Sequence, residues 1–288
     1  MPKFATLIVA LSCAVAPVWA AEPAPSKVQG TLQLNGKPIA VTHVYAHQTD
    51  NAEGFAEAPE LRIALVDRAL PAGSLAGVGF PPVWGLAMQG EVRGVMLSMT
   101  PGKPDTVRAI WFSGEPGESP ASVSGGDKWK KVSMSAERVS GEVERQDTKP
   151  SGGFDRPWGV YALSFDTPIV HDAAVTADLK GKAAAQGSPQ IKVLRQLAAA
   201  MKAGDMAGVK QLTTARSFAQ RDAQRRAASI SDADFKRGMQ KMGAQMTAEI
   251  GKFDRVIVRS DRAAAVLKEK DGALVMELAQ VDGQWKAD

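Results

Sequence analysis

The spacing of apolar residues divides the chain into two parts. Between residues 28 and 171, short apolar runs alternate with polar positions, as in strands that bury one face. Glycine and proline clusters separate these runs. The pattern predicts about nine strands, at 31–34, 39–47, 61–66, 84–88, 92–99, 107–112, 129–134, 139–144 and 158–165. We therefore expect residues 28–171 to form a mainly β domain, an antiparallel β-sandwich or barrel.

The apolar period becomes helical after residue 187. Ser188 is a suitable N-cap, Pro189 suits the first helical position, and Gly204 follows the last apolar residue of the stripe. Asp205 predicts the start of a second short helix, and Ser231 that of a longer one. An arginine-rich segment lies between them at 217–228.

The period returns to two after residue 251. Apolar residues alternate at 253–259, 263–268, 273–280 and 284–286, with turn residues between the runs. Residues 188–288 should therefore form an α+β domain, in which helices are followed by an antiparallel β-meander. The stretch 172–187, rich in alanine, lysine and glycine, is interpreted as the linker between the domains.

The first twenty residues are typical of a secretory signal peptide. Lys3 is followed by an apolar run at 4–16, and the segment ends in the small residue Ala20. We expect cleavage there, a flexible start at 21–27, and a periplasmic or secreted protein without a transmembrane segment. Cys13 also fits part of a lipoprotein signal, so a lipid anchor on Cys13 is the less favoured alternative.

The C-terminal domain resembles the nuclear transport factor 2-like superfamily of cystatin-like α+β cones. The similarity lies in the Gly-Asp helix end within 197–212 and in a tryptophan after an Asp-Gly turn within 278–286. The resemblance implies a curved sheet around helices that encloses an apolar pocket. Through 30–37 and 43–46, the first domain resembles uncharacterised secreted bacterial β domains. Since cone-shaped folds carry many activities, the resemblance assigns no function.

A stripe of large apolar residues on the last helix is the candidate ligand-binding surface. Together with a tryptophan of the closing hairpin, the candidates are Phe235, Met239, Met242, Met246 and Trp285. The helical spacing equally fits core packing, in which methionine fills irregular gaps. Because thioethers bind soft metals, a copper-handling protein is one alternative function, although no cofactor is expected.

A cluster of basic residues gives the C-terminal part its positive charge. Residues 183–288 contain 18 Lys and Arg against 12 Asp and Glu, whereas residues 21–182 contain 16 against 19. Arg221, Arg225 and Arg226 are candidates for contact with an anionic surface. Acidic partners at helical spacing favour an ordinary solvated helix face instead. The export signal and modest charge density argue against nucleic acid as a partner.

The sequence contains no recognisable catalytic motif. Residues 183–288 contain neither histidine nor tyrosine, so the expected pocket has no evident acid–base pair. We therefore expect an exported, non-catalytic protein that binds a small ligand or an envelope protein. The alternative is an envelope hydrolase or isomerase that uses His43, His47 or His171 at the domain junction, which requires a histidine beside a carboxylate in a shared cleft.

Overall fold

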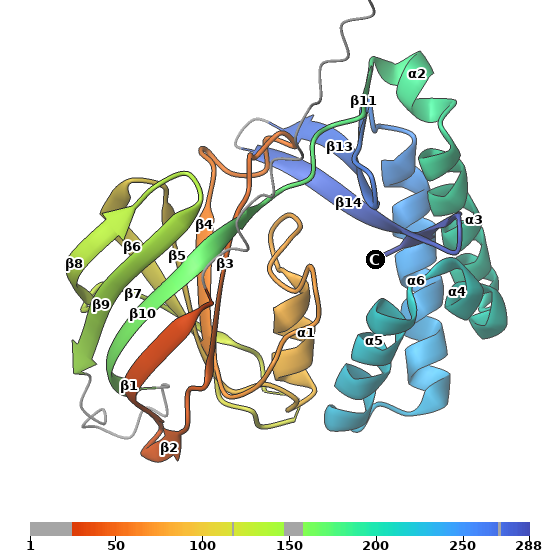
Figure 1. Cartoon of the computed structure of the whole chain (residues 1–288). Coiled ribbons are helices and arrows are strands. Elements are labelled where there is room, and N and C mark those ends of the chain that lie inside the picture. Colours follow the sequence, from red (N-terminus) through yellow and green to blue (C-terminus); the bar gives the residue numbers. More distant parts are fainter. Residues whose placement is uncertain (1–24, 117, 147–157, 270–271) are drawn as a thin grey trace, which may run out of the picture.

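The computed structural model describes residues 25–116, 118–146, 158–269 and 272–288. The expected signal peptide at 1–20, Cys13 and most of the expected flexible start lie outside the described residues. The chain has an α+β structure: a large, mostly antiparallel sheet comes first, and helices followed by a second sheet come after it (Figure 1). In the part of the chain described, no helix is both long and apolar enough to cross a membrane.

Ten strands of the described N-terminal part pair into one sheet, in the order β2-β1-β10-β3-β4-β5-β6-β7, with β9 beside β10 and β8 beside β9. Their bounds are β1 (Lys27–Leu34), β2 (Lys37–Ile39), β3 (His43–Gln48), β4 (Leu61–Val66), β5 (Gly94–Thr100), β6 (Lys103–Phe112), β7 (Ala121–Ser124), β8 (Lys128–Met134), β9 (Arg138–Gln146) and β10 (Gly159–His171). Only the contact of β10 with β3 is parallel among these pairings. The long β10 thus pairs with three strands, β1, β3 and β9.

The run at 84–88, predicted as a strand, is instead part of helix α1 (Pro82–Met88). Pro82 occupies the first turn of the helix, where its missing N–H costs nothing. Val83 and Ala87, four positions apart, are both buried on the face that packs against the sheet. The prediction was wrong because so short an apolar run does not distinguish the two periods.

Strand β4 is buried along its whole length, because both of its faces are covered. Leu61, Ile63 and Leu65 belong to the main core of the sheet. Ala64 and Val66 belong to a second cluster, which packs under α1 on the opposite face. A strand covered on both faces explains why this part of the sequence is apolar at every position except Arg62.

The C-terminal part contains helices that pack on a five-stranded antiparallel sheet. The elements are β11 (Ala177–Lys180), α2 (Lys182–Gln186), α3 (Pro189–Ala203), α4 (Met206–Leu212), α5 (Ala215–Ala227), α6 (Asp232–Ile250), β12 (Arg255–Val258), β13 (Arg262–Glu269), β14 (Gly272–Val281) and β15 (Gln284–Ala287). The sheet has the order β11-β12-β13-β14-β15. The predicted sequence of helices and meander is confirmed.

The helix ends predicted from local signals occur where expected. The hydroxyl of Ser188 accepts a hydrogen bond from the Ile191 N–H, and Gly204 ends α3 in the left-handed conformation. Asp205 caps α4 and Ser231 caps α6 in the same way as Ser188. The apolar faces of α3 and α6 then pack together against the sheet.

The stretch 172–187 contains regular structure where we expected only a linker. Strand β11 pairs with β12 at the edge of the second sheet, and α2 follows it. Leu179 of β11 packs against the C-terminal core, which the alanine-rich composition of the stretch did not indicate. Only the first residues of this stretch, before β11, connect the two sheets.

Candidate functional site

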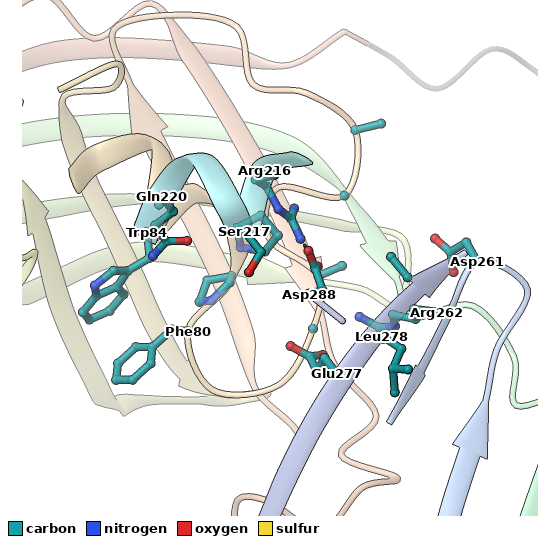
Figure 2. Close-up of a pocket in the computed structure, with 18 of the residues that line it drawn as sticks. Phe80, Trp84, Arg216, Ser217, Gln220, Asp261, Arg262, Glu277, Leu278 and Asp288 are labelled. Carbon is teal, nitrogen blue, oxygen red and sulfur yellow. Dashed lines mark hydrogen bonds and ion pairs between the residues drawn. The ribbon is translucent and has the colours of Figure 1, made fainter. Parts of the chain in front are cut away.

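A cleft of about 420 Å³ lies between the two parts of the molecule. One wall consists of the loop before α1 and α1 itself, with Phe80 and Trp84. The other walls are α5 and the second sheet, with Arg216, Arg262 and Glu277 (Figure 2). We call this space the interdomain cleft. Its lining combines charged and polar side chains with alanine, proline and leucine side chains and with the aromatic pair Phe80 and Trp84, whose ring centroids are 4.5 Å apart.

A second cavity, of about 400 Å³, lies between α3, α6 and the second sheet. We call it the apolar cavity, because most of the side chains around it are hydrophobic: Phe55, Val78, Leu197, Met201, Met242, Met246, Leu274, Val275 and Met276. Phe55 and Val78 come from the N-terminal part of the chain, so both parts contribute to its wall. Its volume is within the range of small-molecule sites, about 300–1,000 Å³.

The interdomain cleft and the apolar cavity share three lining residues: Arg221, Glu277 and Asp288. These charged side chains lie where the two spaces meet. A molecule that occupied both spaces would contact all three. We call them the junction residues.

Glu277 is a partly buried carboxylate held by the opposite part of the chain. Its Oε1 accepts a hydrogen bond from the Val78 N–H at 2.9 Å. Burial raises the pKa of Glu277 to about 7, although the Val78 bond and the positive charge of Arg262 oppose this shift. The Glu277 carboxyl therefore changes its charge near neutral pH.

The loop that carries Val78 depends on glycine at position 77. Gly77 has φ +94°, and a Cβ there would lie 2.9 Å from Glu277 Oε1. Arg62 of β4, which is 3% exposed, holds this loop against the first sheet. Its Nη1 donates hydrogen bonds to the carbonyls of Leu75 and Gly77, each at 2.9 Å. The sequence signal for this contact is an arginine at position 62 within an otherwise apolar strand.

Arg221 of α5 differs from the other arginines around the cleft. Its Nη1 atom is buried and, like Nη1 of Arg262, makes no hydrogen bond with any described residue. No ion pair in the described part of the chain includes Arg221, and burial lowers the pKa of its guanidinium. By contrast, Arg216 pairs with Asp288 and Arg262 pairs with Asp172 at 2.5 Å.

Helix α5, which carries Arg221, is held at both ends. At its start, Thr214 Oγ1 donates to Asp288 Oδ1 at 2.6 Å, and the Thr214 N–H donates to the Ala287 carbonyl at 2.8 Å. Further along, Gln224 Nε2 donates to Met88 Sδ of α1 at 3.3 Å. Gly85 of α1 allows this approach, since a Cβ there would lie 2.7 Å from the side chain of Gln220.

A buried ion-pair cluster joins the two parts of the chain beside the cleft. Arg259, with a side chain 1% exposed, pairs with Asp50 at 2.6 Å and Glu53 at 3.2 Å. Asp172 accepts from Arg262 and from His47 Nε2 at 2.5 and 2.8 Å. Burial alone would raise the pKa of Asp172, but the His47 bond and the Arg262 charge hold it well below its usual range.

The five predicted ligand-binding residues are not all brought together. Met242, which is 49% exposed, and Met246, which is 8% exposed, line the apolar cavity. Met239 is 3% exposed and belongs to the C-terminal core, against which Phe235 and Trp285 pack. The three methionines therefore do not form one accessible surface.

The three predicted anionic-surface residues also separate. Arg225 pairs with Asp222 at 2.9 Å and with Asp232, and Arg226 pairs with Asp222 at 3.0 Å. These two belong to a helix face with internal ion pairs, as the spacing of charges indicated. Arg221, on the same helix, instead reaches the junction of the two cavities.

The three histidines do not share a site. His47 is buried beside Asp172, and neither of them lines the interdomain cleft or the apolar cavity. His43 Nδ1 is 2.8 Å from Thr42 Oγ1, and His171 Nε2 donates to the Ala136 carbonyl. The described residues contain no group of three or more histidine, cysteine, aspartate or glutamate side chains able to hold a metal ion.

Comparison with known proteins adds no information about the site. No protein-family model, curated protein or solved structure matches the chain. The cavities and the residues around them are therefore the evidence for a function.

Proposed function

We propose that the protein is an exported, non-catalytic binding protein whose small ligand occupies the apolar cavity. The observation that carries this proposal is the cavity of about 400 Å³ whose lining is mostly hydrophobic. Methionines at 201, 242, 246 and 276 contribute to the lining, and methionine adapts well to ligands of different shape. An apolar cavity with a few charged groups at one end is the usual form of a small-molecule site.

The position of Phe55 shows that the first part of the chain contributes to the wall of the apolar cavity. Phe55 is 46% exposed although it lies on the cavity wall, and its ring would be 3.3 Å from a Cβ at Gly79. Arg255 holds the same loop by donating to the Ala52 carbonyl at 2.9 Å. A ligand in the apolar cavity would therefore bury apolar surface from both parts of the protein.

The finer description of the fold belongs to the same proposal. We propose that the first sheet curves into a sandwich or barrel, since a Cβ on Gly159 of β10 would lie 3.3 Å from the ring of Trp111 on β6. These two strands are separated by three others in the sheet order. For the second part, helices that pack across a five-stranded sheet, with the apolar cavity between them and open on one side, support a relationship to the nuclear transport factor 2-like cones.

Binding of a neutral fluorescent probe tests the proposed function. We expect saturable binding of N-phenyl-1-naphthylamine to the mature protein, with enhanced fluorescence. Met246→Trp and Leu274→Trp would fill the cavity and should weaken binding by at least about tenfold, a loss of roughly 1.4 kcal/mol. Val170→Trp, at a position that is 60% exposed in the first sheet, is the matched control.

Two outcomes would count against the small-ligand proposal. Absence of saturable binding would remove it. Equal affinity in the filled variants and the control would place the probe elsewhere, and would favour the alternative in which the partner is an envelope protein. Thermal unfolding of each variant shows whether a loss of binding reflects a loss of folding.

A further inference from the structure

We infer that the ligand is an aliphatic monocarboxylate whose carboxylate binds Arg221, while its chain occupies the apolar cavity. This inference rests on the proposed function, and it names the chemical class of the ligand. Arg221 lines the apolar cavity and the interdomain cleft together. Its buried Nη1 has no partner among the described residues.

An unpaired buried guanidinium is costly unless a partner compensates it. Burying a charge without a counter-ion disfavours the folded state, and proteins pair such groups or use them at sites. The nearby arginines already have their carboxylates: Arg216 has Asp288 and Arg262 has Asp172. Arg221 is therefore the one arginine that lines both cavities, and no carboxylate of the described residues pairs with it.

The balance of charge at the junction indicates a single negative charge on the ligand. Arg221 contributes one unpaired positive charge, whereas the other two arginines are neutralised by ion pairs. Glu277 and Asp288 line the same two cavities, while Glu249 lines the apolar cavity and Asp261 lines the cleft. A dianionic phosphate would meet these carboxylates with more repulsion than a carboxylate would. Protonated Glu277 can also donate a hydrogen bond to a carboxylate oxygen.

The apolar cavity indicates the rest of the ligand. Its walls beyond the junction are mostly hydrophobic side chains, chiefly Leu197, Met246 and Leu274, together with the polar Gln245 and Glu249 of α6. A flexible alkyl chain can follow such a lining and lose its contact with water, a gain of about 0.8 kcal/mol per buried CH₂. Together, the two regions fit an amphipathic anion.

Calorimetric titration of the mature protein with decanoate, decanol and decyl phosphate tests the inference. We expect decanoate to bind at least about tenfold more tightly than decanol, because a hydrogen bond to a charged group adds affinity. Arg221→Met should remove this advantage and leave decanol binding unchanged. Arg226→Met on the same helix, where the side chain is 68% exposed, should change neither affinity.

The results separate the inference from the proposed function. Equal binding of decanol and decanoate, unaffected by Arg221→Met, would retain the apolar cavity as a site and overturn the carboxylate subsite. Absence of binding by all three probes would contradict both. Tighter binding of decyl phosphate than of decanoate would overturn the monocarboxylate and assign a phosphate.

Thermal unfolding distinguishes a structural role of Arg221 from a role in ligand binding. If the guanidinium mainly stabilises the fold, Arg221→Met should lower the melting temperature. If it serves the ligand, the free Arg221→Met protein should melt at the same or a higher temperature, since the variant removes an unpaired buried charge. Decanoate should then raise the melting temperature of the wild type more than that of the variant.

Discussion

The carboxylate of Glu277 accepts a hydrogen bond from the Val78 N–H at 2.9 Å, across 199 positions of the sequence. The contact joins the second sheet to the glycine-rich loop of the first part. It also places a titratable group where the interdomain cleft meets the apolar cavity. The charge of the Glu277 side chain therefore affects both the contact between the two parts of the chain and the electrostatic potential in the candidate site.

We predict that Glu277→Gln changes the pH dependence of stability. The pKa of Glu277 is about 7 in the folded protein, against an ordinary value of 4.5. Because the folded state binds this proton more tightly, wild-type stability should fall as pH rises from about 4.5 to about 7, by up to about 3 kcal/mol. Glutamine keeps the acceptor for Val78 but does not ionise, so urea unfolding should show the variant gaining on the wild type between about pH 4.5 and pH 7 and keeping that gain above pH 7.

The control for this comparison is Glu57→Gln, at an exposed position of the first part. Its stability relative to the wild type should not depend on pH over the same range. A constant difference between Glu277→Gln and the wild type from pH 4 to pH 8 would contradict the raised pKa of Glu277.

Decanoate affinity is predicted to fall as pH rises from about 6 to about 8. The ionised Glu277 carboxylate would repel a ligand carboxylate bound to Arg221, so the proton on Glu277 and the ligand should favour each other. The charged groups around Glu277 are Arg262, Asp288 and Glu53, with Arg221 on the same cavities. Titrations should show a loss of about three- to tenfold in the wild type.

The same titrations with Glu277→Gln identify the responsible group. The variant should bind decanoate with an affinity that is nearly constant from pH 6 to pH 8. If the full pH dependence remains in the variant, another titrating group near the junction is responsible. Decanol, which is uncharged, should bind both proteins equally at each pH.

Arg259→Ala is predicted to separate the two parts of the protein. The substitution would leave Glu53, which is 5% exposed, without its buried cation. Loss of one partner from a buried pair costs about 3–5 kcal/mol. We expect urea unfolding to show this loss and to change from one transition to two, because the two parts then unfold separately.

Arg237→Ala is the control for Arg259→Ala. Arg237 pairs with Asp234 on α6, and its side chain is 68% exposed, so its removal should change the urea midpoint little. An Arg259→Ala protein that unfolds in one transition, with a midpoint near that of the control, would contradict the interdomain role of Arg259.

The helix ends could be predicted from the sequence because their determinants are local. Ser188 and Gly204 bond with groups within four residues of themselves, so neighbouring residues were enough to place α3. The β-meander was predictable for a similar reason, since its strands are consecutive and joined by short turns. The run at 84–88 was misassigned because docking against the sheet decides its conformation.

The candidate site could not be predicted because it depends on how the two parts of the chain dock. Arg221, Arg225 and Arg226 look equivalent in the sequence, but only Arg221 is turned toward the second sheet and the cavities. Glu277 lies on an alternating strand, and its burial is decided by a loop almost 200 residues away. Interactions across such distances leave no local pattern in a single sequence.

The contact between α3 and α6, which forms one side of the apolar cavity, predicts opposite effects of two similar substitutions on α6. At Gly243, a Cβ would lie 2.5 Å from the Lys202 backbone nitrogen and 2.8 Å from the Ala198 carbonyl oxygen. Since backbone atoms cannot easily move aside, Gly243→Ala should destabilise the protein by about 1–3 kcal/mol.

At Gly238, on the exposed face, a Cβ would meet nothing within 4 Å. Gly238→Ala should therefore stabilise the protein by about 0.5–1 kcal/mol, the usual gain from replacing glycine inside a helix. Urea unfolding of the two variants measures both effects, and stabilisation by both would show that α3 and α6 do not approach each other at Gly243.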